Sequence, residues 1–154
     1  NLLVVQTFSK SRALAGMRLG AAFGQPHLID GMNRIKYSFN PYNLDRISME
    51  VGIASIEDEG YFRESVSKIT ATRDRIRLLL LARNYTVLPS KSNFLFLRHP
   101  TSHGADFAQR LREKGILVRH FNEERINGYI RLTVGSNEEM DAFLKAADEL
   151  GGDF

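Results

Sequence analysis

The fold is decided by the first stretch of the chain, Asn1-Leu-Leu-Val-Val-Gln-Thr-Phe-Ser-Lys10-Ser-Arg-Ala-Leu-Ala-Gly-Met-Arg-Leu-Gly20. A short apolar run, residues 2–6, leads into hydroxyl side chains and then Lys10, and Arg18 follows eight positions later. Continuous apolar runs of this length are typical of strands that are covered on both faces in α/β folds. We therefore expect a covered strand with Lys10 just beyond its C-terminal end, where α/β folds bind their ligands.

The composition is that of an ordinary globular protein with no strong charge. Of its 154 residues, 43% are hydrophobic and 25% are charged, and the net charge is +3. Basic residues are spread along the chain, so nucleic-acid binding is not indicated. Cysteine is absent, which excludes disulfides and thiolate metal sites. No apolar run is long enough to span a membrane, and we expect a cytoplasmic protein with neither nucleic-acid nor membrane partners.

The chain begins at Asn1, directly inside a strand-like run. Proteins seldom start in this way, so we expect the sequence to be a fragment whose N-terminal part precedes Asn1.

The pattern of apolar residues changes near residue 84. Before it we expect strands at 2–6 and 17–23, a short helix from Pro26, and two helices at 44–57 and 59–83. After it, strands at 85–88, 93–98, 116–119 and 129–134 are expected to alternate with helices at 104–114 and 137–150. The second half is therefore predicted to be a small α+β domain with an antiparallel or mixed sheet, and the boundary is placed after residue 83.

Two details of the predicted helices bear on the packing. Leu44, Ile47, Val51 and Ala54 recur on one side of the 44–57 helix and are expected to face inward. Arg73 in the 59–83 helix is expected to point outward or to extend its charge to solvent.

The residues around Lys10 suit an aldehyde cofactor that carries a phosphate. A lysine that forms a Schiff base must be able to lose its proton. A phosphate is held by hydroxyl groups, backbone N–H groups and a planar guanidinium, and Thr7, Ser9 and Arg18 supply such side chains. The alternative is that Lys10 is a solvated surface charge, as most lysines are.

The segment Thr7-Phe-Ser-Lys10-x-x-x-Leu14-Ala-Gly16-x-Arg18-x-Gly20 resembles the cofactor-lysine motif of the fold-type I, pyridoxal-phosphate-dependent aminotransferases of classes I and II. Within them it is most similar to the histidinol-phosphate aminotransferases. The resemblance continues through Asn40-Pro-Tyr-Asn43, Ser92-Asn-Phe94, Gly115-Ile-Leu-Val-Arg119 and Tyr129-Ile-Arg-Leu-Thr-Val-Gly135. It covers nearly the whole chain, but only the C-terminal part of the family's sequence.

The resemblance implies a fold and a cofactor. Residues 1–83 correspond to the C-terminal part of the large α/β cofactor domain with its long interdomain helix, and residues 84–154 to the small α+β domain. Lys10 would hold pyridoxal 5′-phosphate covalently and act as the catalytic acid and base. Thr7, Ser9 and Arg18 would hold its phosphate.

Two arginines in the second half are candidate substrate ligands. Strand alternation places Arg131, Thr133 and Gly135 on the face opposite Ile130, Leu132 and Val134. An arginine in so apolar a strand needs a partner, either an internal carboxylate or a bound substrate. The resemblance implies that Arg131 binds the substrate carboxylate and Arg119 the substrate phosphate; from the residues alone, Arg119 reads more readily as a solvated charge at a strand end. Asn93 is a further substrate-binding candidate, although its alternative is a structural role.

The remaining polar residues give weaker signals. His27, His99, His103 and His120 lack the spacing of metal ligands, and His99 and His103 are expected at the surface. The resemblance also implies a homodimer, in which Tyr42 would reach the active site of the neighbouring subunit.

The predicted function is transamination between histidinol phosphate and 2-oxoglutarate. The isolated chain is expected to be inactive, because the family's other cofactor-holding groups lie upstream of the motif. Another aminotransferase of this class, or a phospho-amino-acid decarboxylase on the same fold, is one alternative. A non-catalytic folded module is another.

Overall fold

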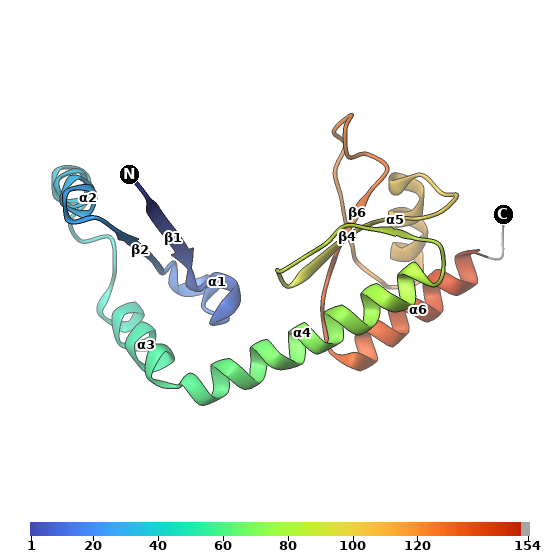
Figure 1. Cartoon of the computed structure of the whole chain (residues 1–154), viewed down its shortest axis with the longest axis horizontal. Helices are drawn as coiled ribbons and strands as arrows, with labels where there is room; N and C mark the ends of the chain where they lie inside the picture. Colours follow the sequence, from blue (N-terminus) through green and yellow to red (C-terminus); the bar gives the residue numbers. More distant parts are fainter. Residues whose placement is uncertain (152–154) are drawn as a thin grey trace. The chain divides into compact units, whose positions relative to one another are not determined.

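The computed structural model describes residues 1–151, which form parts of two compact units, Asn1–Val66 and Ser67–Phe154. The division falls inside one continuous helix, α4 (Glu59–Leu81), drawn in green in Figure 1. It lies earlier than residue 83 because Ile76 and Leu80, in the second half of α4, belong to the core of the second unit. The two units are described separately below.

The first unit begins with a two-stranded antiparallel sheet. Strand β1 (Leu3–Thr7) pairs with β2 (Gly20–Gly24), so that Thr7 lies opposite Gly20. Between them lie the one-turn helix α1 (Phe8–Ser11) and a single 3₁₀ turn, η1 (Ala15–Met17). The expectation that the first strand is covered on both faces is wrong for the described chain: all five residues of β1 are exposed, because no further layer packs on them in residues 1–151.

Helix α2 (Pro26–Phe39) and helix α3 (Arg46–Glu57) complete this unit before α4 begins. At the start of α3, Asp45 accepts hydrogen bonds from the backbone N–H of Ser48 (2.9 Å) and from its hydroxyl (2.6 Å). These bonds lower the pKa of the Asp45 carboxyl. Asp45 is therefore a charged N-cap, which stabilises the first turn of the helix.

The face of α3 that is buried differs from the one predicted. Its buried residues are Ser48 and Gly52, whereas Ile47 is 69% exposed. A Cβ atom at Gly52 would lie 3.0 Å from a methyl carbon of Leu19, the buried residue immediately before β2. Helix α3 packs with its small residues toward Leu19, so the row of larger apolar residues does not identify its inner face.

The second unit is built on a four-stranded antiparallel sheet. Its strand order is β3-β4-β6-β5, with bounds Thr86–Val87, Phe94–Arg98, Ile130–Thr133 and Arg119–His120 in that order. Helices α5 (Gly104–Glu113) and α6 (Asn137–Gly151) are connected in sequence to these strands (Figure 1). The predicted α/β class and the antiparallel α+β second half are confirmed.

One face of this sheet carries the hydrophobic core. The alternation predicted for β6 is confirmed, since Ile130, Leu132 and Val134 are buried at 1%, 3% and 7% exposure. Fully buried residues of the strands and helices pack together here: Ile76, Leu80, Leu95, Leu97, Phe107, Leu111 and Phe143. Arg131 lies on the opposite face, and that face carries the candidate site.

Polar contacts join α4, and the turn that follows it, to α6. Arg75 donates to Asp141 (2.7 Å), and Arg83 makes two hydrogen bonds with Asp148 (2.6 and 2.9 Å). The bonds from Arg83 lower the pKa of the Asp148 carboxyl. Within residues 1–151, none of the helices has both the length and the apolar composition needed to cross a membrane.

Candidate active site

Lys10 lies on α1, immediately after β1. Thr7 is the N-cap of this short helix: its hydroxyl oxygen accepts a hydrogen bond from the backbone N–H of Ser9 (3.1 Å) and lies 2.8 Å from the Ser9 hydroxyl. The two hydroxyl groups are thus held together on the turn that carries Lys10. The lysine itself is exposed, so its amine is accessible to a ligand.

Arg18 is held next to this turn by backbone contacts. The backbone N–H of Phe8 donates to the carbonyl of Leu19 (3.1 Å), which joins the segment after β1 to the segment before β2. Arg18 adopts the left-handed conformation with φ of 55°, uncommon for a residue other than glycine. Its guanidinium donates to the carbonyl of Ala15 (2.8 Å) and is otherwise exposed.

The donors on these two segments fit a phosphate and an aldehyde. Two hydroxyls, a guanidinium and a primary amine are donors that bind phosphate oxygens or react with a carbonyl carbon. Gly20 allows the segments to lie this close, because a Cβ atom there would be 3.1 Å from the Gln6 carbonyl oxygen. Lys10, Thr7, Ser9 and Arg18 therefore form the first candidate cluster, within the first unit.

The second candidate cluster lies in the second unit, on the sheet face that does not carry the core. An open pocket of about 360 Å³ occurs there. It is lined by Leu88, Pro89, Ser90, Ser92, Phe94, Phe96, Phe121, Ile126 and Arg131. Apolar and aromatic walls with one cationic group are typical of small-molecule sites.

Arg131 is the charged residue in the wall of this pocket. Its guanidinium carbon lies 4.7 Å from the centre of the Phe94 ring and 5.8 Å from that of Phe121. Its Nε atom is buried without a hydrogen-bond partner, and among residues 1–151 no carboxylate forms an ion pair with this guanidinium. The internal carboxylate considered for Arg131 is thus not found in the described chain.

Arg119 lies directly opposite Arg131 on the neighbouring strand, β5. Its guanidinium carbon is 5.4 Å from the centre of the Phe121 ring, and the side chain is exposed. Like charges that face each other across two strands are destabilising. This pair is consequently suited to bind an anion, which would neutralise both groups.

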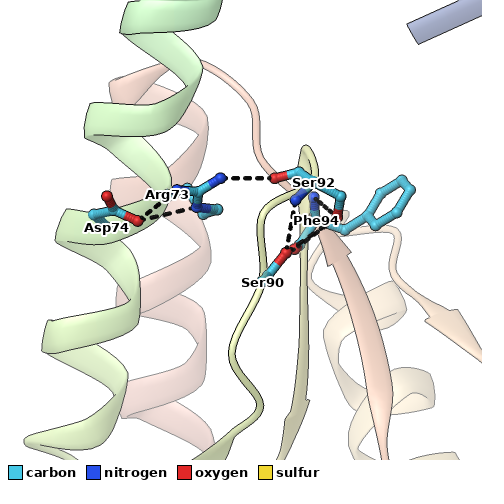
Figure 2. Close-up of polar contacts among 5 residues, drawn as sticks. All are labelled: Arg73, Asp74, Ser90, Ser92 and Phe94. Atoms are coloured by element: carbon cyan, nitrogen blue, oxygen red, sulfur yellow. Dashed lines mark hydrogen bonds and ion pairs between the residues drawn. The ribbon is translucent and has the colours of Figure 1, made fainter. Parts of the chain in front are cut away.

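The wall formed by residues 90–94 is fixed from α4, as Figure 2 shows. Arg73, which is only 6% exposed, donates from its guanidinium to the carbonyl of Ser92 (3.2 Å) and pairs with Asp74 (2.9 Å). The Ser90 hydroxyl donates to the Phe94 carbonyl (2.6 Å), and the Phe94 ring extends on the side away from α4. The expectation that Arg73 points outward is wrong, because its guanidinium is buried and binds the carbonyl of Ser92 in the turn.

Asn93 lies on the same turn and is half-buried. Its carbonyl accepts a hydrogen bond from the backbone N–H of Val134 (2.9 Å), which extends the pairing of β4 with β6. No described contact assigns its side chain to a ligand, so its substrate-binding role stays a prediction. Tyr42, the other residue singled out by the resemblance, is 90% exposed.

Sequence reasoning missed the aromatic partners of the arginines. Phe94 and Phe96 alternate along β4, and strand pairing places Phe96 opposite Arg131. The signal was present in that alternation, but it could be used only with the register of β4 against β6. Phe121 lies outside the strands, and no pattern in the sequence marked it.

The structure corrects the placement of His99. It is 5% exposed and packs edge-on against Tyr85, with 5.0 Å between the ring centres. Its Nδ1 atom accepts hydrogen bonds from the backbone N–H groups of Thr101 (3.2 Å) and Ser102 (3.0 Å). Burial, with a smaller effect of Arg110, lowers the pKa of His99, and burial raises the pKa of Tyr85 to about 12.

In the part of the chain that the structure describes, no group of three or more histidine, aspartate or glutamate side chains is arranged to hold a metal ion.

Comparison with known proteins agrees with the motifs and the fold. The family model for aminotransferase class I and II matches residues 1–146. The chain is 50% identical over 145 residues to a histidinol-phosphate aminotransferase of Brachyspira hyodysenteriae, covering 94% of this chain and 41% of that protein. Histidinol-phosphate aminotransferase 1 of Hydrogenovibrio crunogenus is also 50% identical, over 97% of this chain and 42% of its own length.

The solved structures give the same picture at lower identity. Histidinol-phosphate aminotransferase from Sinorhizobium meliloti, solved in complex with pyridoxal 5′-phosphate, superimposes with a TM-score of 0.78 at 26% identity. The alignment covers 97% of this chain and 42% of that one. The chain thus spans about two fifths of the length of the relatives it matches. It belongs to the aminotransferase class I and II family.

Proposed function

We propose that this chain supplies the cofactor lysine and the substrate-binding arginines of a pyridoxal-phosphate-dependent aminotransferase. The proposed reaction is transamination between histidinol phosphate and 2-oxoglutarate, a step of histidine biosynthesis. The observation that carries the proposal is the turn on which Thr7, Ser9 and Lys10 stand together, joined by backbone hydrogen bonds to the segment that carries Arg18. The 50% identity to histidinol-phosphate aminotransferases supports the choice of substrate.

Each residue of the lysine cluster has a part in this proposal. When bound, pyridoxal phosphate withdraws electrons from the substrate carbon that loses its proton. Lys10 would hold the cofactor through its amine, and the same amine, once released, would take the proton from the substrate Cα as a general base. Thr7, Ser9 and Arg18 bind the phosphate oxygens, which fixes the orientation of the cofactor relative to Lys10.

The arginines of the second unit provide the charges that recognise the substrates. Arg131 binds the carboxylate of the amino or oxo acid through two parallel N–H groups. Arg119 binds the phosphate of the phosphorylated amine. The absence of an internal ion pair for either guanidinium in residues 1–151 supports this role, because both charges are then available to an external anion.

The cofactor part of the proposal is tested on the 154-residue chain by incubation with pyridoxal phosphate, reduction with borohydride and peptide mass spectrometry. We expect the cofactor mass on the peptide that contains Lys10, and no such modification in Lys10→Ala. Arg18→Gln should weaken cofactor binding without moving the modification to another lysine. Modification of several exposed lysines to the same extent in the native chain and in Lys10→Ala would contradict specific attachment at Lys10.

The choice of substrate is tested through Arg119 in the full-length enzyme. With Arg119→Ala, the KM for histidinol phosphate should rise while the KM for 2-oxoglutarate changes less. An unchanged KM for histidinol phosphate would remove the phosphate role and favour another aminotransferase or a decarboxylase. If the native chain takes up no cofactor at Lys10, the non-catalytic module becomes the better reading.

The finer expectations on location and assembly belong to the same proposal. We place the protein in the cytoplasm, where amino-acid biosynthesis occurs, and we propose a homodimer. Exposed apolar side chains in the first unit, such as Ile35 and Phe39 of α2, are compatible with a covered surface in an assembly. Sedimentation of the full-length protein, measured at several concentrations, tests the dimer directly.

A further inference from the structure

Phe121, in the wall of the pocket, contacts both Arg131 and Arg119. The centre of its ring lies 5.4 Å from the guanidinium carbon of Arg119 and 5.8 Å from that of Arg131. Both distances are within the range in which a cation is attracted to the negative face of an aromatic ring. A single side chain, from the loop that follows β5, therefore links the two positive charges.

The two guanidinium groups repel each other, and an attractive contact to both of them offsets that repulsion. Arg119 and Arg131 are register partners on neighbouring strands, where like charges repel. Among residues 1–151 neither has a carboxylate partner, and the Nε atom of Arg131 has no hydrogen-bond acceptor. An aromatic ring attracts both cations without neutralising them, so it holds them in place and leaves their N–H groups available to a ligand.

The Phe121 ring is itself held by aromatic packing. It meets the ring of Phe96 edge-on, with 6.3 Å between centres and 65° between planes. Phe96 stacks in turn on Tyr129, at 4.9 Å and 12°. Because β4 and β6 fix Phe96 opposite Arg131, the position of Phe121 is tied to the sheet.

We propose that Phe121 is a positioning residue that holds Arg119 and Arg131 together so that both bind one phosphate monoester dianion. A carboxylate, with one charge and two oxygens, is satisfied by one guanidinium, whereas a phosphate has oxygens for two. The ring thus favours phosphorylated amines over unphosphorylated ones. The inference rests on the proposed function for the assignment of both arginines to the substrate.

The inference is tested by titrating the ¹⁵N-labelled 154-residue chain with inorganic phosphate and, separately, with acetate at equal ionic strength. The side-chain Nε–H signals of Arg119 and Arg131, assigned from Arg→Lys variants, report the binding. In the native chain we expect phosphate to shift both signals along one binding curve, with higher affinity than acetate. Equal affinities for the two anions would overturn the inference.

Variants of Phe121 separate positioning from packing. Phe121→Leu keeps an apolar side chain but removes the ring, and we expect roughly tenfold weaker phosphate binding with little change for acetate. Phe121→Tyr should restore the native affinity. Leu78→Ala, at an exposed apolar residue of α4 outside the pocket, is the control and should leave the ratio of the two affinities unchanged. Native phosphate affinity in a folded Phe121→Leu chain would contradict the role, and the dispersion of the β4 and β6 amide signals reports folding.

The Lys10→Ala variant distinguishes this inference from the proposed function. If the two arginines form the phosphate site, their binding curves are the same with and without Lys10, even where cofactor attachment fails. If the shifts of Arg119 and Arg131 disappear in Lys10→Ala, phosphate binds elsewhere and the inference is overturned. Attachment of cofactor at Lys10 is scored independently by mass spectrometry.

Discussion

Arg131 is a residue whose placement costs stability. Its Nε atom is buried without a partner, and a buried donor without a hydrogen bond costs about 1–3 kcal/mol. Its cation–π contacts with Phe94 and Phe121 contribute about 0.5–1 kcal/mol each, which offsets only part of this destabilisation. A residue kept at a net cost is more readily explained by binding than by folding.

Replacement of Arg131 by methionine should therefore separate stability from binding. In Arg131→Met we expect an unchanged free energy of unfolding or a rise of up to about 1 kcal/mol, because the unpartnered donor is removed. Phosphate binding should be lost. Urea unfolding and the anion titration measure the two effects. Arg98→Met, at an exposed arginine of β4, is the control and should retain phosphate binding. A large loss of stability in Arg131→Met, but not in Arg98→Met, would show that Arg131 has a structural role instead.

His99 makes the stability of the second unit depend on pH. Burial lowers its pKa, so the unfolded chain binds a proton at a higher pH than the folded chain does. As pH falls below about 6.5, the ordinary histidine value, the unfolded state gains more protons and the free energy of unfolding decreases. We expect this loss between about pH 7 and pH 5.

The measurement is urea unfolding over that range in the native chain and in His99→Asn. The asparagine keeps an acceptor for the backbone N–H groups of Thr101 and Ser102 but does not titrate. Its stability should fall less steeply with acidification, whatever its absolute value. His27→Gln, at an exposed histidine of α2, should behave like the native chain, and parallel slopes in all three would refute the assignment.

At the scale of elements, α4 contributes to the pocket through a single buried charge. Arg73 reaches from the helix to the carbonyl of Ser92 and so fixes the turn that carries Phe94. The helix thereby sets the position of a ring that contacts Arg131. Sequence periodicity identifies α4 but cannot show this contact, since it assigns arginines to the solvent side.

Arg73→Met should loosen that turn. Hydrogen bonds to charged groups contribute about 1.5–3 kcal/mol, so we expect a loss of stability in this range together with faster amide exchange at residues 90–94. Arg63→Met on the same helix removes an exposed pair with Glu59 and should cost less than about 1 kcal/mol. Unchanged exchange at residues 90–94 in Arg73→Met would show that the turn is held without α4.

At the scale of the whole chain, local patterns predicted most elements and the faces of the core sheet. Alternation in β6 placed Arg131 opposite the core because two-residue periodicity follows from strand geometry alone. The motif around Lys10 was enough to predict the family, because its residues lie close together in the sequence; the role of Lys10 itself stays a prediction. The exposure of β1, the inner face of α3, the burial of His99 and the position of Phe121 beside both arginines were missed, since each depends on which distant segment packs there.

The exposed strands of the first unit predict self-association. Val5 and Phe23 are 69% and 57% exposed, on a sheet to which the described residues contribute two strands and no more. We expect concentration-dependent association of the 154-residue chain and a larger monomer fraction in Val5→Lys, measured by light scattering after size-exclusion chromatography. Leu117→Lys, at a residue of the second unit that is 75% exposed, is the control. Equal effects of both substitutions would indicate non-specific aggregation.

Within residues 1–151, Arg131 and Arg119 have no carboxylate partner, and this has a practical consequence for handling the protein. A ligand that binds only the folded form raises its stability by about 2.7 kcal/mol when present at a hundred times its Kd. For the phosphate site proposed above, phosphate in a buffer is such a ligand, so melting temperatures recorded in phosphate and in an amine buffer should differ. Thermal shift assays of this chain would then report buffer composition as well as mutations, and substrate affinities measured in phosphate would be competition values.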